Sequence, residues 1–146
     1  MSSIAIIRLG AGGLVLAALV AAVAGVVLAQ GKAPLQRYGS VIGLKPEKLA
    51  YYKELHAAVW PAVLKMIKDC HIQNYSIYLK EIEPGKLYLF SYLEYTGKDF
   101  AADMAKMAAD PTTRKWWKET DPCQFPIPVR APGEKWAAME EVFHLD

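Results

Sequence analysis

The sequence has 146 residues, of which 53% are hydrophobic, 11% aromatic and 22% charged, with a formal net charge of +2. This length fits about one domain, and the composition excludes intrinsic disorder, a collagen-like repeat and a disulfide-dense miniprotein. The charge is too close to neutral for a surface that binds nucleic acid or anionic lipid. We therefore expect one globular domain that has no nucleic-acid partner.

The chain begins with an apolar stretch. Residues 9–29 contain no charged residue, and Arg8 precedes them. A basic start, an apolar run and small residues before a polar switch resemble a cleaved signal peptide, but about 20 apolar residues also suffice for a retained anchor. Residues 1–29 are therefore expected to form an apolar N-terminal helix, either a signal peptide or a membrane anchor. Residues 30–34 are then a linker, and residues 35–146 a domain outside the cytoplasm, exported to the periplasm or medium or tethered through the apolar stretch.

The first half of the domain predicts a strand, a helix and a hairpin. Residues 35–44 alternate as in a strand, and apolar residues then recur at helical spacing from position 46 to 70. Pro61 lies inside that helix, so we expect a kink one turn before it. Two strands follow at residues 72–82 and 87–95, joined by a turn.

The two strands of the hairpin differ in their side-chain pattern. The first strand alternates, and its pattern places four residues on one face: Gln73, Tyr75, Ile77 and Leu79. The second strand is apolar or aromatic on both faces, which is typical of a strand covered on both sides. Helices can provide one cover, so we expect a second copy of the chain, a homodimer, to provide the other.

The second half predicts two helices, a loop and a strand. Thr96 and Asp99 give a helix start signal, and Asp110 followed by proline starts a short helix that carries two tryptophans. The proline-rich residues 121–133 indicate an irregular loop, and residues 136–145 alternate as a closing strand. The resulting β-α-β-β-α-β order predicts an α+β, ferredoxin-like fold with helices on one face of an antiparallel sheet.

Motifs for metals and cofactors are absent from the sequence. There is no phosphate-binding glycine loop, nucleotide fingerprint or Cys-x-x-Cys, and the three histidines form no local metal motif. We therefore expect no cofactor and no metal. Cys70 and Cys123, the only cysteines, could pair in an exported protein, but two separate buried thiols are the favoured interpretation.

Five side chains form a candidate site. Tyr52 and His56 are four residues apart and share one helix face, Tyr75 lies on the more apolar face of the next strand, and Trp116 and Trp117 lie on the short helix. Imidazole titrates near neutral pH and suits acid–base catalysis, while aromatic and phenol groups suit the faces and hydroxyls of a sugar. The pattern alone leaves ordinary core packing open for each residue.

Four spaced motifs give these residues a family likeness. They are Tyr52-x3-His56-x3-Trp60-Pro61, residues 74–78, Trp116-Trp117-Lys118 and residues 139–143. In this order, from about residue 36 to the C-terminus, they resemble the L-rhamnose mutarotase family. The resemblance implies small dimers of the α+β barrel type that interconvert the α and β anomers of L-rhamnose or a related deoxy sugar without a cofactor. Members that serve sugar catabolism are normally cytoplasmic, which is at odds with the leader.

The resemblance also implies roles for the candidate site. His56 would be the proton donor, and the sugar would be contacted by Tyr52, Tyr75, Trp116 and Trp117. No base is identified, although three acids qualify by charge: Asp121, Glu140 and Glu141. Two alternatives remain: a non-catalytic module that binds a sugar or small ligand, and another enzyme of the dimeric α+β barrel type, cofactor-free or haem-binding.

Overall fold

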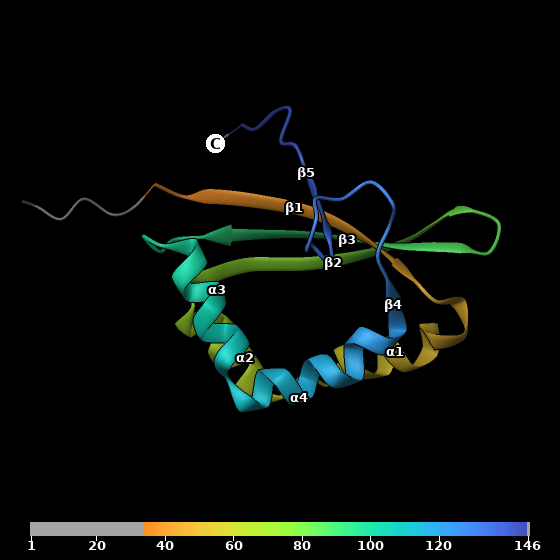
Figure 1. The fold of residues 1–146 in the computed structure, drawn as a ribbon, viewed down its shortest axis with the longest axis horizontal. Helices are drawn as coiled ribbons and strands as arrows, with labels where there is room; N and C mark the ends of the chain where they lie inside the picture. Colours follow the sequence, from red (N-terminus) through yellow and green to blue (C-terminus); the bar gives the residue numbers. More distant parts are fainter. Residues whose placement is uncertain (1–33, 146) are drawn as a thin grey trace, which may run out of the picture. The chain divides into compact units, whose positions relative to one another are not determined.

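The computed structural model describes residues 34–145. The predicted leader, residues 1–29, lies outside the described residues, as does the linker up to residue 33. Within the described residues the chain forms an antiparallel sheet with helices on one face (Figure 1), which confirms the predicted α+β class and layer arrangement.

Three long strands make up most of the sheet. The three long strands are β1 (Gln36–Leu44), β2 (Ile72–Glu83) and β3 (Lys86–Tyr95). The strand order is β2-β3-β1-β4, where β4 is Gln124–Phe125, and β5 (Ala137–Met139) also pairs with β1. Every pairing is antiparallel. The hairpin of β2 and β3 agrees with the predicted topology, whereas β4 lies in the stretch predicted to be a loop.

Within residues 34–145, four α-helices and two short 3-10 turns make the second layer. The helices are α1 (Leu49–Ala57), α2 (Pro61–Asp69), α3 (Phe100–Ala109) and α4 (Pro111–Thr120), and the turns are η1 (Pro46–Lys48) and η2 (Asp121–Cys123). Figure 1 shows all four helices on the same side of the sheet. Asp99 and Asp110 cap α3 and α4, accepting hydrogen bonds from the backbone N–H groups of Ala102 and Thr113. The cap at Asp110 is as predicted, whereas the start signal for α3 predicted Thr96 as the cap, three residues before Asp99.

The helix expected over residues 46–70 is interrupted rather than kinked. α1 ends at Ala57, and Trp60 has extended backbone angles (φ −60°, ψ 131°) before Pro61 opens α2. A proline disfavours helical angles in the residue before it and cannot donate the helical hydrogen bond. The break turns the chain between α1 and α2 and lets Trp60 pack against α4.

The alternation expected for β2 is also shifted. Gln73 pairs with Glu94 and Ser76 with Tyr92, so two residues of β2 oppose one of β3, and Asn74 has a positive φ of 47°. Such a bulge inserts one residue and reverses the faces beyond it. The prediction that Gln73 shares a face with Ile77 and Leu79 is therefore wrong.

The end of the chain departs from the expected strand over residues 136–145. Only Ala137–Met139 pair with β1, and beyond them the chain turns away on the side of the sheet opposite the helices (Figure 1). Three apolar side chains beyond the strand are largely exposed: Val142, Phe143 and Leu145. Within residues 34–145 this segment neither buries these side chains nor pairs with another strand beyond Met139.

The two faces of the sheet are distinguished along β3. Leu87, Leu89, Ser91 and Tyr95 are buried beneath the helices and define the inner face, and the alternate residues define the outer face. The core on the inner face consists of two separate clusters. The first cluster contains Ile42, Leu44, Tyr52, Leu87, Leu89 and Cys123, and the second contains Cys70, Ile72, Tyr95 and Met107. Cys70 and Cys123 are free and buried in different clusters, which confirms the interpretation as separate thiols.

Candidate functional site

His56 is fixed on α1 by its position one turn after Tyr52. The two rings stack with centroids 4.1 Å apart, and His56 Nδ1 lies 2.9 Å from the backbone carbonyl oxygen of Tyr52. A carbonyl oxygen only accepts hydrogen bonds, so Nδ1 carries the proton and donates it. In the neutral ring this leaves the lone pair on Nε2 as the acceptor.

Burial sets the protonation of this pair. Loss of solvent around His56 lowers the pKa of its imidazole from the ordinary 6.5, and the hydrogen bond to the backbone of Tyr52 opposes this in part. Burial raises the pKa of the Tyr52 phenol far above its usual range. At neutral pH the site therefore holds a neutral imidazole stacked on a neutral phenol.

Aromatic rings from α4 and the α1–α2 connection surround His56. The ring of Trp116 meets His56 and Trp60 edge-on, each at a centroid distance of 5.4 Å. Trp116 is 6% exposed, whereas His56 and Trp60 are half-buried. The partly exposed imidazole therefore rests against a buried indole, which restricts its orientation.

Tyr75 belongs to the same site. Its neighbour Ser76 pairs with Tyr92 on the outer side of the sheet, so alternation places Tyr75 on the inner face, and its phenol interacts electrostatically with that of Tyr52. The side chain is 44% exposed, yet its surroundings desolvate the hydroxyl and raise its pKa.

Trp117 lies apart from the rings around His56. It is half-buried and packs against the second cluster. An open hollow of about 410 Å³ runs beside it, lined by Arg114, Trp117, Lys118, Asp121 and Pro122. No side chain that contacts His56 lines this hollow, so Trp117 is the predicted site residue that the structure connects least closely to the imidazole.

Sequence reasoning missed one polar residue of the site, Gln124. Its side chain is buried, and its amide donates a long hydrogen bond of 3.5 Å to the hydroxyl of Tyr52. Gln124 lies on β4 between two prolines, where the sequence predicted a loop. Its pairing with Leu44 places it on the inner face, a position that only the strand register reveals.

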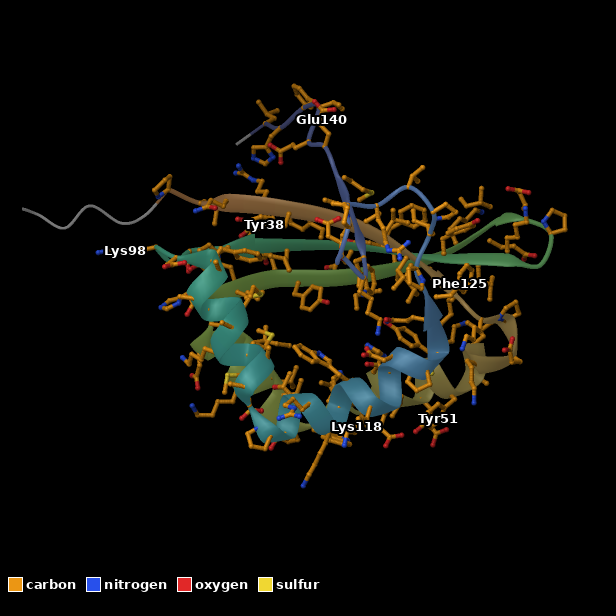
Figure 2. The ribbon with its side chains drawn as sticks, viewed as in Figure 1. Tyr38, Tyr51, Lys98, Lys118, Phe125 and Glu140 are labelled. Carbon is orange, nitrogen blue, oxygen red and sulfur yellow. The ribbon has the colours of Figure 1, made fainter. Side chains whose placement is uncertain are left out.

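The acids proposed as bases lie away from the imidazole. Asp121 forms an ion pair with Lys135. Figure 2 shows Glu140 beyond the sheet, on the side opposite the helices, and Glu141 follows it in the exposed tail. Among residues 34–145 none of these carboxylates is a hydrogen-bond or electrostatic partner of His56. Among residues 34–145 no cluster of three or more histidine, cysteine or acidic side chains could hold a metal ion.

Comparisons with known proteins agree in pointing to one family. The family described as L-rhamnose mutarotase matches residues 37–145. The L-rhamnose mutarotase of Phocaeicola vulgatus is 32% identical over 109 residues, which cover 70% of this chain and 91% of that protein. The enzyme of the same name from Listeria monocytogenes is 32% identical over 111 residues, or 76% and 99% of the two chains. The crystal structure of an L-rhamnose mutarotase from Formosa agariphila superposes with a TM-score of 0.57 at 24% identity, covering 76% of this chain and 99% of that one, and shows the same fold.

These matches correct the expected location. The domain was expected outside the cytoplasm, but the relatives that match it over nearly their whole length carry the name of a family whose sugar-catabolic members are normally cytoplasmic. The expectation of an exported or tethered domain is therefore wrong. As a separate observation, no helix within residues 34–145 has the length and apolar character to cross a membrane.

Proposed function

This chain belongs to the L-rhamnose mutarotase family, isomerases that interconvert the α and β anomers of that sugar, and from this premise we propose how its residues perform the reaction. In our proposal His56 carries the proton. Four aromatic side chains hold the sugar: Tyr52, Tyr75, Trp116 and Trp117. The observation that carries the proposal is the orientation of His56, whose Nδ1–H is occupied by the carbonyl of Tyr52 so that Nε2 is left for the substrate.

Mutarotation requires one proton to change oxygens. The hydroxyl on C1 loses its proton, the C1=O1 bond forms, the C1–O5 bond breaks, and O5 gains a proton. Rotation about C1–C2 and the reverse steps close the ring on the other face. Neutral His56 accepts the O1 proton at Nε2, and the imidazolium then donates it to O5, directly or through a water or the Tyr52 hydroxyl. Positioned acid–base catalysis of this kind contributes about 10²–10⁴-fold.

The lowered pKa of His56 suits this shuttle. A ring that is neutral at neutral pH can begin as the base, and its imidazolium, once formed in a half-buried site, is a stronger acid than in water. One residue thus serves both roles that the family likeness divides between a donor and an unidentified base. No carboxylate of the same chain is needed at the reacting atoms.

We further propose that the outer face of the sheet forms a homodimer of the ferredoxin-like, dimeric α+β barrel type. The outer side of β3 carries Tyr88, Phe90 and Tyr92, and Tyr78 on β2 is 62% exposed. The ring of Phe125 covers Gly43, where an added Cβ would lie 2.3 Å from it, so the aromatic surface continues across β1. An exposed surface of this composition marks an interface between proteins.

Saturation-difference proton NMR tests the catalytic proposal. L-Rhamnose is mixed with the full-length protein, the anomeric proton of one anomer is saturated, and the loss of signal from the other reports exchange. We expect transfer well above that of buffer, and loss of the excess in the His56→Ala variant.

The two alternatives appear as distinct outcomes of the same experiment. Sugar binding with exchange at the buffer rate indicates a non-catalytic binding module. An absorbance spectrum with a Soret band, together with no exchange, indicates a haem enzyme of the same architecture.

A further inference from the structure

The middle of the inner face carries two serines where the rows on either side are apolar. Ser40 on β1 pairs directly with Ser91 on β3, and their hydroxyl oxygens are 2.6 Å apart. In the flanking rows, Ile42 faces Leu89 and Tyr38 faces Leu93. The serine row is therefore a polar interruption of the inner face.

This interruption coincides with the division of the core. Ile42 and Leu89 belong to the first cluster, whereas Tyr38 and Leu93 pack against the second. The two serine side chains are smaller than the side chains of the rows beside them.

The serine row is also adjacent to the proposed sugar site. Ile77 on β2 pairs with Ser91, and Tyr75, two residues before it on the same strand, interacts with the phenol of Tyr52. Helices α1 and α4, which carry His56 and the tryptophans, lie across from this face of the sheet (Figures 1 and 2). A sugar held at His56 therefore faces the side of the sheet that carries the serine row.

The hydrogen bond between the two serines uses only one of their two hydroxyl hydrogens. Two hydroxyls that bond to each other use one O–H group, so the second O–H remains for another acceptor. Ser91 is 6% exposed, while Ser40 is half-buried, so Ser40 is the member that a ligand can reach. In a dry core the leftover O–H would be an unmet donor, which costs stability; beside a sugar it meets a hydroxyl.

We propose that Ser40 hydrogen-bonds a ring hydroxyl of the sugar other than the anomeric one, and that Ser91 is a positioning residue that orients the Ser40 hydroxyl. This inference rests on the proposed function, because it places the sugar between His56 and the sheet. In that function O1 and O5 face the imidazole, so the hydroxyls that remain for a contact with Ser40 are those on C2, C3 and C4. The pair thereby contributes to choosing among sugars that differ at one of these carbons.

The test combines serine variants with deoxy sugars in the full-length protein. Anomer exchange is measured by NMR for L-rhamnose and for its 2-deoxy, 3-deoxy and 4-deoxy analogues, giving kcat and KM for each. We expect Ser40→Ala to lower kcat/KM for L-rhamnose about tenfold, mainly through KM. Ser91→Ala lowers it less, and the double variant loses no more than Ser40→Ala. For one deoxy analogue, the one that lacks the contacted hydroxyl, Ser40→Ala changes nothing.

Ser76→Ala is the matched control, because Ser76 lies on the outer face of the same sheet, paired with Tyr92. It should leave kcat and KM unchanged. Each variant is first checked for an unchanged thermal unfolding midpoint, which the loss of one small hydroxyl permits. Equal losses with all four sugars, or no loss with L-rhamnose, overturn the assignment of Ser40.

The outcome is separable from failure of the proposed function. If the wild-type protein does not accelerate exchange, the mutarotase proposal fails, and the serine pair is then judged on the dissociation constant for L-rhamnose, measured by calorimetry. Weaker binding of L-rhamnose by the Ser40→Ala variant than by the wild type then still supports a contact between Ser40 and the sugar. Binding of unchanged strength, or no binding by the wild type, contradicts it.

Discussion

The inner and outer faces of the sheet are both rich in apolar and aromatic side chains, but one chain covers only the first. Leu87, Leu89 and Tyr95 lie beneath the helices and are nearly inaccessible, whereas Tyr78 on the outer face is 62% exposed. The inner face is also interrupted by polar groups, Ser40, Ser91 and Gln124, and the outer face has its aromatic rings at the surface. We propose that the difference separates two tasks, with the chemistry on the covered face and assembly on the uncovered face.

This division predicts different consequences for substitutions on each side. Changes at the inner site should alter anomer exchange and leave the oligomeric state intact. Changes at the outer face should alter the mass of the particle first. The following predictions test that separation, from the largest expected effect to the smallest.

The largest effect is expected from His56→Ala. Removing the imidazole removes the proton carrier, so exchange should fall about 10²–10⁴-fold toward the buffer rate, with the dimer mass unchanged. His71→Asn is the control, because His71 is an exposed histidine bonded to Asp103 outside the site and its positive φ of 58° suits asparagine. Undiminished exchange in folded His56→Ala would remove this residue from the mechanism.

Trp116→Ala should cause the largest loss of stability. Trp116 is buried against Trp60 and His56, and truncating such a side chain costs about 3–5 kcal/mol. Urea unfolding followed by circular dichroism measures the loss. Trp117→Ala, in a half-buried neighbour, should cost clearly less. Equal losses for the two variants would contradict the assignment of Trp116 as the packed partner of the imidazole.

On the outer face, Tyr78→Arg should weaken the dimer. A charge placed in an apolar interface loses its hydration, so we expect dissociation to become about 100-fold more favourable. Light scattering at micromolar concentration then shows the monomer mass, where the wild type shows the dimer mass. Leu64→Arg, an exposed apolar position on α2, is the matched control and should stay dimeric. A monomeric wild type would refute the assembly itself.

The smallest effect concerns pH. Burial lowers the pKa of His56 below 6.5, so the neutral, proton-accepting ring should persist as the pH falls through 6.5 and be lost only at the lower folded pKa. Exchange above the buffer rate should therefore decline with a midpoint below pH 6.5. Between 6.5 and that midpoint the unfolded chain binds the proton more readily, so stability also falls as the pH falls. A midpoint at or above 6.5, by activity or by NMR titration of the ring, would contradict this.

The sequence predicted the parts of the fold that depend on local patterns. The helix cap at Asp110, the hairpin of β2 and β3, and the four-residue spacing of Tyr52 and His56 all follow from neighbours in the chain. The family likeness added roles for the aromatic residues, of which Tyr52 and Trp116 lie against the imidazole.

Features that depend on strand register could not be predicted from the sequence. The bulge at Asn74 moves Gln73 to the other face, and no residue type at that position announces it. Gln124 joins the inner face through two residues of pairing with β1. Ser40 and Ser91 are 51 positions apart and meet only because β1 and β3 are paired in one particular register. Long-range pairing of this kind leaves no periodic signal in either segment.

The most direct test of the division between the faces is a crystal structure of the His56→Asn variant with L-rhamnose. The substitution removes the proton carrier and preserves a polar group of similar reach, so an intact sugar should be trapped. We expect it on the inner face, with O1 and O5 toward residue 56 and a ring hydroxyl within hydrogen-bond distance of Ser40. L-Rhamnose bound without contact to residue 56, or on the outer face, would contradict the assignment of the site.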